Sequence, residues 1–374
     1  MTAAESEGLL PGPFEREHYV PILLTRQGER LALRVLAGDV KDRCTPLFVI
    51  HPVPKDFDLG QPKSTVDAHL RKMPAQLIRD WGTRPAMLDV RYIEPGERMD
   101  DGSHPVDWLL RTCAEAGLFL APVVSPDRDS AYRHAAYGVA DRIGASLCFR
   151  LSPGDWVRLA TPGGSGDLLA MLDESGRLPG TIHLILDLEA EANLTTQITS
   201  SALSEALRAL PHANEWASVT VAGTGMPEGT AEIGADNVAR VPRLAWQVWR
   251  GLDPSLPRRP GFGDYGVQHP DPMSDFDPRF MQSSAQLRYT ESQDWFVARG
   301  RGLRVAGVEQ VRALAVQVTA QPTFSGRGFS WGDDWLADCA AGAGTPGNQM
   351  VWRKVATSHH LTYVTRQIAN LLGS

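Results

Sequence analysis

The sequence predicts a (β/α)8 barrel of the TIM type with a C-terminal decoration, and two observations support this α/β fold. Apolar runs of strand length alternate with segments of helical periodicity, which is typical of βαβ units and a parallel sheet. Eight such units fill about 250 residues, the usual size of a closed eight-stranded barrel. An open doubly wound parallel sheet is the alternative, although neither a Rossmann fingerprint nor a P-loop pattern occurs.

The clearest expected strand covers residues 181–189. Its apolar run is nearly continuous, as expected for a parallel strand that is covered on both faces, and it ends on Asp187 and Glu189. Seven shorter runs have the same character: 18–24, 45–50, 86–90, 118–124, 145–151, 217–222 and 263–267. We therefore expect eight strands whose C-terminal ends meet at one mouth, where barrels bind their ligands.

Segments with apolar residues at helical spacing separate these strands. The expected helices are 31–40, 64–81, 106–116, 129–143, 167–174, 200–210 and 241–252. Pro74 should interrupt the second helix, because proline lacks the backbone N–H that a helix interior needs. The stretch 152–166 is rich in Gly and Pro and is expected to be a loop.

The C-terminal third loses this alternation. Two β-like runs, 284–290 and 294–299, predict a hairpin, and helices are expected at 308–318 and 359–372. No shift in composition marks a domain boundary. We therefore expect one domain over 1–374, with 18–270 as the barrel core and 271–374 folded over the mouth. Trp331, Trp335 and Trp352 should form the core of this elaboration or stack a base or sugar.

Bulk composition excludes several classes of protein. The net charge of -7 and the pI of 5.8 argue against a general nucleic-acid-binding surface. Four scattered cysteines lack metal-type spacing, which favours a reducing cytoplasm. The N-terminus lacks the pattern of a signal peptide, and no apolar run is long enough for a membrane span. A cytoplasmic protein without membrane contact is expected.

Polar residues at the ends of the expected strands give the candidate site. Asp187, Glu189, Asp264 and His51 are the catalytic candidates, since carboxylates can act as bases or hold a divalent cation, although a metal requirement stays unknown. The candidates for ligand binding are Arg150, Tyr265 and Asp89 at strand ends, together with Arg288 and His360, which the C-terminal segment should bring to the same anion site. No pattern for a nucleophile elbow or a zinc protease occurs.

Two of these candidates also have a purely structural interpretation. Arg150 lies inside an apolar strand and must be paired, because an isolated buried charge is very costly. We expect Asp187 or Asp89 as its partner, and the pair could be scaffolding only. His359 and His360 are expected at a helix start that Ser358 caps, and either histidine could instead belong to a site.

Several motifs, taken in order, resemble the "beta protein" family of phages and bacteria. They are found at 19–23, 28–33, 186–188, 263–265, 287–290, 332–333, 347–348, 352–353 and 359–362. The resemblance covers nearly the whole chain and implies no catalytic residue. Its link to phages implies a role in phage defence. We expect a hydrolase that acts on a phosphorylated or nucleotide-like ligand, or else a non-catalytic defence component that recognises a phage protein or a nucleotide signal.

Overall fold

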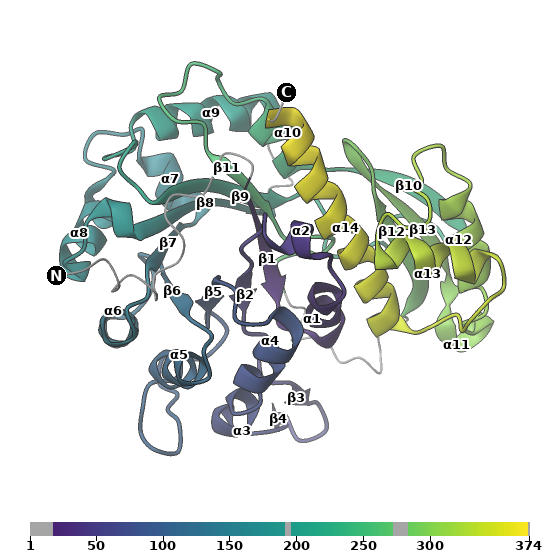
Figure 1. Ribbon diagram of the computed structural model, residues 1–374, viewed down its shortest axis with the longest axis horizontal. Coiled ribbons are helices and arrows are strands. Elements are labelled where there is room, and N and C mark those ends of the chain that lie inside the picture. The colour runs from purple at the N-terminus through teal and green to yellow at the C-terminus, as the bar shows by residue number, and fades with distance from the viewer. Residues whose placement is uncertain (1–17, 191–195, 272–282, 373–374) are drawn as a thin grey trace.

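A closed barrel of eight parallel strands forms the body of the protein (Figure 1). The computed structural model describes residues 18–190, 196–271 and 283–372. The barrel strands are β1 (Tyr19–Leu24), β2 (Leu47–Val49), β5 (Ala86–Asp89), β6 (Leu120–Val124), β7 (Leu147–Leu151), β8 (Ile182–Ala190), β9 (Ser218–Thr224) and β11 (Gly261–Asp264). Strand β1 pairs with both β2 and β11, which closes the sheet. The predicted barrel is confirmed, and the open sheet is excluded.

Each strand buries both faces, which explains the nearly continuous apolar runs. Along β8, Ile185 packs in the barrel interior, whereas Leu184 and Leu186 pack in the larger core between the strands and the helices. Successive side chains of a strand point to opposite faces. Asp187 therefore shares the interior face with Ile185, and the same alternation places Asp89 and Arg150 inside.

Helices surround the strands in a ring (Figure 1). They are α1 (Gln27–Arg34), α2 (Gly38–Lys41), α3 (Val66–Leu70), α4 (Met73–Trp81), α5 (Pro105–Glu115), α6 (Ser130–Ile143), α7 (Pro153–Arg158), α8 (Gly166–Ser175), α9 (Thr196–Arg208) and α10 (Leu244–Arg250). The interruption expected near Pro74 separates α3 from α4, where proline occupies the first turn and loses no hydrogen bond. Helix α7 lies in the segment 152–166 that was expected to be a loop. The capping box formed by Ser152 and Asp155 is the feature of the sequence that indicates the start of this helix.

The elaboration contains an antiparallel sheet of three strands in the order β10-β13-β12. Its elements are β10 (Asn237–Pro242), β12 (Ser284–Thr290), β13 (Asp294–Gly302), α11 (Leu303–Ala306), α12 (Val311–Thr319) and α13 (Trp331–Ala340). The predicted hairpin is β12 and β13. Strand β10 was missed, and the helix expected from residue 241 begins only at Leu244. A small hairpin, β3 (Lys55–Asp56) with β4 (Gln61–Pro62), also went unpredicted.

Helix α14 (Gln349–Leu372) connects the two hydrophobic cores. Trp352 belongs to the core beneath the three-stranded sheet, whereas Leu361 and Ile368 belong to the main core around the barrel. The expected start near residue 359 is wrong. Asn348 caps the helix with its side-chain oxygen, which accepts hydrogen bonds from the backbone N–H groups of residues 350 and 351, and Ser358 lies inside the helix.

The elaboration lies beside the barrel, next to α14, in the view of Figure 1. The expectation that residues 271–374 fold over the mouth stays a prediction. Helix α14 fixes the position of the described part, since its first half packs against the small sheet and its second half packs on the outside of the barrel. The second half of α14 thus contributes to the barrel core, which the sequence analysis had assigned to residues 18–270.

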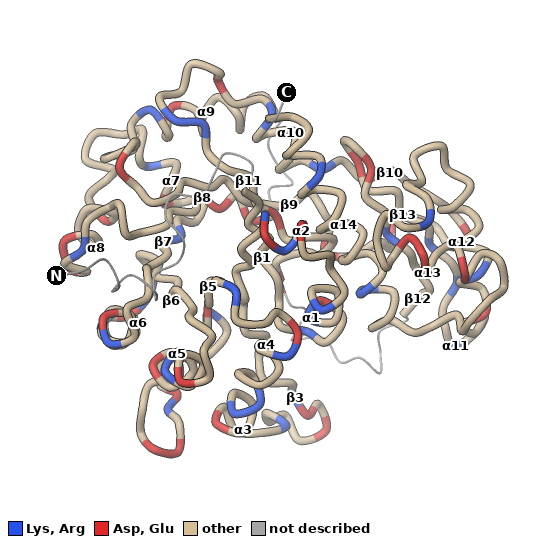
Figure 2. The backbone as a smooth tube through the Cα atoms, viewed as in Figure 1, with Lys and Arg blue, Asp and Glu red and all other residues tan. Residues whose placement is uncertain are grey.

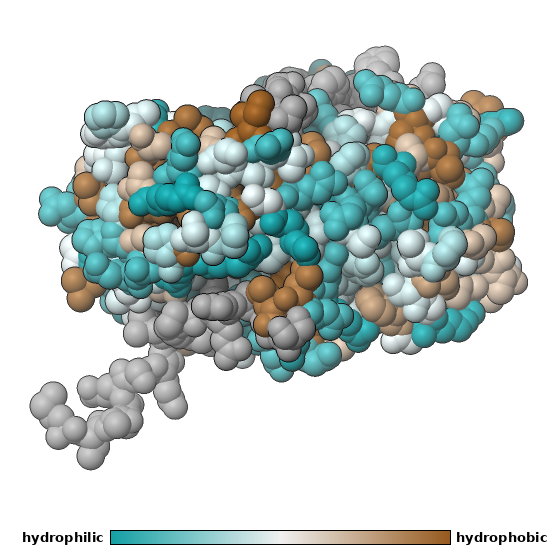
Figure 3. Space-filling view, turned by 90° about the horizontal axis from the view of Figure 1, so that it is seen from above, coloured by the Kyte–Doolittle hydropathy of each residue, from teal (hydrophilic) through white to brown (hydrophobic). Residues whose placement is uncertain are grey.

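Charges of both signs are spread along the chain. Figure 2 shows Lys and Arg interspersed with Asp and Glu over the helices and loops. The face in Figure 3 is mainly hydrophilic, with separate hydrophobic patches. None of the helices in the described ranges has the length and apolar character that a membrane span requires.

Candidate functional site

Arg150 stands at the centre of a closed polar network in the barrel mouth. Its Nε donates to Asp187 Oδ2 at 2.7 Å and its Nη1 to Asp89 Oδ2 at 2.8 Å. The hydroxyl of Tyr265 accepts from Arg150 Nη2 and donates to Asp187 Oδ2 at 2.6 Å. All four side chains are buried. The expected pairing of Arg150 with a carboxylate is confirmed, with both proposed partners engaged.

The electrostatics of this network favour the ionised pair. Burial opposes the charge on Arg150, but Tyr265, Asp187 and Asp89 outweigh it and hold the pKa of the guanidinium above its ordinary value. Burial raises the pKa of the Tyr265 phenol, so the phenol stays neutral and can donate to Asp187. Arg128 also donates to Asp89. Neither carboxylate is open to a substrate or a metal in this arrangement.

Two other catalytic candidates occupy the rim of the mouth. Glu189 pairs with Arg91 at 3.1 Å, and both side chains are partly exposed. His51 Nδ1 and the Thr25 hydroxyl form a hydrogen bond of 2.9 Å. Burial, reinforced by the nearby His69, lowers the pKa of His51 to about 3, so the imidazole is neutral and weakly basic. His51 does not line the mouth pocket described below.

Asp264 and His360 face away from the mouth. They lie between β11 and α14, where His360 Nε2 is 3.0 Å from Asp264 Oδ2. The hydroxyl of Tyr19 donates to Asp264, and Thr290 Oγ1 lies 2.8 Å from His360 Nδ1. Tyr265, the next residue, points into the barrel, so strand alternation sends Asp264 outward. The prediction that both residues belong to the mouth is wrong, because a strand-end position does not fix the strand face of Asp264, and His360 lies on α14, outside the barrel strands.

Asp264 and His360 instead connect the barrel to the elaboration. Burial opposes ionisation of Asp264, but His360, Arg243 and Tyr19 together lower the pKa of its carboxyl group. Burial lowers the pKa of His360, which keeps the imidazole neutral. A neutral ring can donate from Nε2 to the carboxylate and accept at Nδ1 from Thr290 on β12. The hydrogen bonds of Asp264 and His360 thus link the barrel to the three-stranded sheet, which indicates a structural role for both residues.

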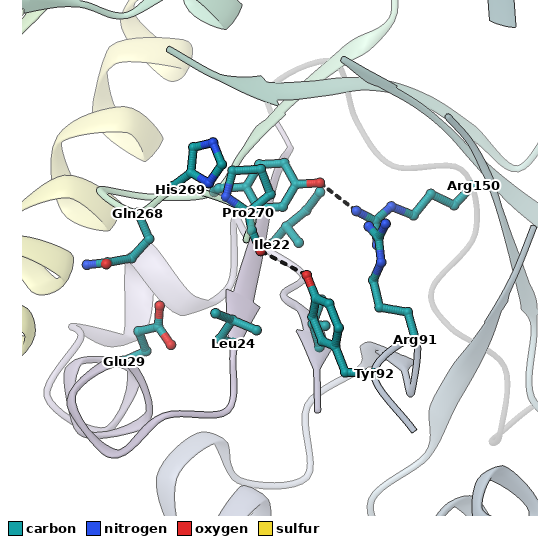
Figure 4. A pocket seen from close by; sticks show the side chains of 11 residues that line it. Ile22, Leu24, Glu29, Arg91, Tyr92, Arg150, Gln268, His269 and Pro270 are labelled. Atoms are coloured by element: carbon teal, nitrogen blue, oxygen red, sulfur yellow. Dashed lines mark hydrogen bonds between the residues drawn. The ribbon is translucent and has the colours of Figure 1, made fainter. Parts of the chain in front are cut away.

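A small pocket in the mouth has an open carboxyl group at one side. The pocket has a volume of about 10 Å³, which is room for about one water molecule. Figure 4 shows Glu29 and Gln268 at one side, Arg91 and Arg150 at the other, and Leu24 between them. Helix α1 begins directly after β1 and places Glu29 in its first turn, at the rim of the mouth.

Glu29 is the feature of this site that the strand-end pattern missed. Its carboxylate accepts a hydrogen bond from the backbone N–H of Arg26, whereas its Oε2 is buried without a partner among the described residues. Burial raises the pKa of Glu29 to about 7, against the opposing effects of Arg353 and Arg26. A buried carboxyl group with a pKa near neutrality suits general acid–base catalysis. The available signal was a glutamate in the first turn after the first strand.

Arg288 lies apart from the mouth network, at a groove between the mouth loop and the three-stranded sheet. Its Nη1 donates to the backbone carbonyl of Val267. The groove has a volume of about 440 Å³ and is lined also by Arg26, Arg299 and Arg353. Gln268 and His269 line both the groove and the mouth pocket. The structure therefore separates Arg150 from Arg288, although both are expected from the sequence to bind the ligand.

The side chains near the mouth do not form a metal centre. No group of three or more His, Cys, Asp or Glu residues within residues 18–190, 196–271 and 283–372 could hold a metal ion. A divalent cation was considered possible from the sequence. The carboxylates of Asp89, Asp187 and Glu189 do not offer it a set of ligands, because each of them already pairs with an arginine.

The fold and the mouth together define a parallel (β/α)8-barrel protein with a sheet-and-helix elaboration beside it. The chain belongs to the Beta protein family, whose model matches residues 19–366. This assignment confirms the resemblance found in the sequence. A comparison with curated proteins found no match.

Comparison with solved structures gave distant similarities. A mutant tryptophan synthase alpha-subunit from Pyrococcus furiosus is 12% identical, with a TM-score of 0.35 and coverage of 67% of this chain and 88% of that one. A putative lyase/mutase from Burkholderia cenocepacia is 14% identical, with a TM-score of 0.34 and coverage of 67% and 76%.

Proposed function

We propose that this protein is a hydrolase that acts on a phosphorylated or nucleotide-like ligand at the barrel mouth. The observation that supports the proposal most directly is Glu29, a buried carboxyl group beside a pocket of water size, with one oxygen that has no hydrogen-bond partner among the described residues. Arg353 acts electrostatically on Glu29 from the groove side, whereas Arg91 and Arg150, across the pocket, are paired with carboxylates. Positive charge beside a general base suits a reaction that develops negative charge on oxygen.

The proposed reaction is a displacement at phosphorus by water. Glu29, ionised, takes a proton from a water molecule as the water oxygen forms a bond to phosphorus. The bond between phosphorus and the leaving oxygen breaks, and the proton passes from Glu29 to that oxygen. A pKa near 7 suits both proton transfers, because the group can accept and release a proton at neutral pH.

The test is a hydrolysis assay with p-nitrophenyl phosphate, bis(p-nitrophenyl) phosphate and ATP, each with Mg²⁺ and with EDTA. Glu29→Gln should reduce turnover by roughly 10²–10⁴-fold, the usual contribution of a general base. Glu205→Gln is the matched control, because Glu205 is exposed on α9 and lines neither the mouth pocket nor the groove. Equal turnover by wild type and Glu29→Gln would remove Glu29 from the mechanism.

A non-catalytic defence component that recognises a phage protein or a nucleotide signal is the second candidate. The closed network around Arg150 favours it, since Asp89 and Asp187 are engaged by arginines and the pocket beside them holds about one water molecule. Ligand binding without turnover of any substrate above would favour this candidate.

A role in phage defence is the last part of the proposal, and the family's occurrence in phages and bacteria motivates it. The measurement is plaque formation on bacteria that express wild-type protein, Glu29→Gln or an empty vector. A hydrolytic defence requires that Glu29→Gln lose protection. Protection that survives this substitution indicates recognition without catalysis, and no protection by wild type rejects the defence role.

A further inference from the structure

We infer that the groove between the mouth loop and the three-stranded sheet binds the phosphate chain of a small ligand, through Arg288, Arg299 and Arg353. This inference rests on the proposed function for the identity of the ligand, and it deepens that function by moving the anion site away from Arg150. The geometry of the groove supports it independently of any catalysis.

An excess of positive charge is the first reason. Among the described residues, Arg288, Arg299 and Arg353 line the groove together with Arg26, Glu228 and Asp271, and Arg26 interacts electrostatically with Glu29 and Asp271. This excess contrasts with the net charge of -7 for the whole chain. Such a local excess of positive charge within an acidic protein attracts anionic ligands.

The hydrogen bonds of these arginines are the second reason. Arg288 donates to the carbonyl of Val267, and Arg299 donates to the Ser284 hydroxyl at 3.1 Å and to the carbonyl of residue 231 at 3.2 Å. Among the described residues, neither arginine has a carboxylate within salt-bridge distance. Neutral oxygens orient a guanidinium but leave its charge uncompensated, so the charge remains available to a phosphate.

Arg353 connects the groove to the mouth. Its Nε is buried and has no hydrogen-bond partner among the described residues. It lies close to Gly28 on α1, where an added Cβ would come within 2.8 Å of the Met350 carbonyl oxygen and 2.9 Å of the Arg353 Cβ. The glycine thus lets α1 and α14 approach, and Arg353 acts electrostatically on both Glu29 and Arg288. A phosphate held there would lie beside the proposed base.

The size of the groove determines the class of ligand. A volume of about 440 Å³ is that of a small-molecule site. Burial, together with repulsion from Arg353, lowers the pKa of Arg288 to about 10, which leaves it protonated at neutral pH. Several arginines that line one groove of this size suit a compact polyanion such as a diphosphate. A long nucleic acid would need basic residues along an extended track, whereas charges of both signs are mixed along the tube in Figure 2.

The experiment is calorimetric titration of the full-length protein with inorganic pyrophosphate, ADP and adenosine at low ionic strength. Wild type should bind pyrophosphate and ADP but not adenosine. Arg353→Gln and Arg299→Gln should each weaken binding at least tenfold. Arg301→Gln is the matched control, because Arg301 lies on β13 with Arg299 but is exposed and pairs with Asp236. This substitution should change the affinity for pyrophosphate less than twofold.

Failure of the binding inference can be distinguished from failure of the proposed hydrolysis. Glu29→Gln removes a nearby negative charge, so it should bind pyrophosphate at least as tightly as wild type even if it cannot hydrolyse anything. The inference is overturned if wild type fails to bind pyrophosphate, or if both arginine variants bind it as wild type does. It is also overturned if a single-stranded oligonucleotide binds more tightly than ADP with the same dependence on Arg353.

Discussion

Arginine side chains have different surroundings in the mouth and in the groove. In the mouth, Arg150 has two carboxylates and a phenol around its guanidinium, and its donors are satisfied within the protein. In the groove, Arg288 donates to a carbonyl, and the buried Nε of Arg353 has no hydrogen-bond partner in the part of the chain that the structure describes. A buried arginine with matched carboxylates belongs to the scaffold. Arginines whose charge is not matched are the ones that can bind an anion.

Removing the matched arginine should have the largest effect on stability. Arg150→Met leaves Asp187 and Asp89 buried without their central cation, so the free energy of unfolding should fall by about 3–5 kcal/mol. Urea unfolding followed by circular dichroism measures the loss. Arg158→Met, at an exposed ion pair, should lose less than about 1 kcal/mol. A loss below 1 kcal/mol for Arg150→Met would contradict the structural role of the network.

The second effect concerns Glu29 and pH. The folded protein raises the pKa of Glu29 from 4.5 to about 7, so between these values the folded state keeps a proton that the unfolded state releases. The contribution of Glu29 to stability is therefore complete below pH 4.5 and is lost as pH rises to 7, by up to ~3 kcal/mol. Glu29→Gln should lack this loss. Urea unfolding of both proteins at pH 4.5 and pH 7.5 tests it, and a difference independent of pH would refute it.

A milder change in the mouth tests the same network. Tyr265→Phe removes the hydroxyl that connects Arg150 to Asp187 and should destabilise the protein by about 1 kcal/mol. Tyr92→Phe is the control, since its hydroxyl donates to the carbonyl of Pro270 at the partly exposed rim. The control should cost less than Tyr265→Phe in thermal unfolding, and the opposite order would indicate that the phenol of Tyr265 is not part of the network.

The smallest effect on stability is expected in the groove. Arg353→Gln should change the free energy of unfolding by no more than about 0.5 kcal/mol, because no carboxylate pairs with Arg353 within the described part of the chain. The measurement is urea unfolding at pH 7.5. A loss above 1.5 kcal/mol would place Arg353 with Arg150 as part of the scaffold and would remove the contrast between the two regions.

The barrel could be predicted because its strands are covered on both faces. Runs such as 182–188 have too few polar residues for a strand with one face in solvent. Eight such runs at regular spacing leave few folds other than a parallel barrel. The partners of Arg150 followed from the cost of an unpaired buried charge. Both predictions rest on physical rules that need no knowledge of the strand register.

The remaining features depend on information that a strand-end pattern lacks. Asp264 and Tyr265 are adjacent, yet one faces α14 and the other the barrel interior, and only the strand register decides which. Strand β10 finds its partner β13 more than fifty residues later in the chain. Glu29 is on a helix and not at a strand end, so a search of strand ends could not include it. The start of α14 was available from Asn348, which is a favourable N-cap.

The most direct test of the contrast compares the thermal shift that inorganic pyrophosphate produces in two variants. Tyr265→Phe should begin from a lower Tm than wild type and show the full wild-type shift, because the mouth network supports the fold and not the anion. Arg353→Gln should begin near the wild-type Tm and show little or no shift, since stabilisation by a ligand falls with its affinity. The reverse pattern, a shift lost in Tyr265→Phe and kept in Arg353→Gln, would contradict the assignment of the anion site to the groove.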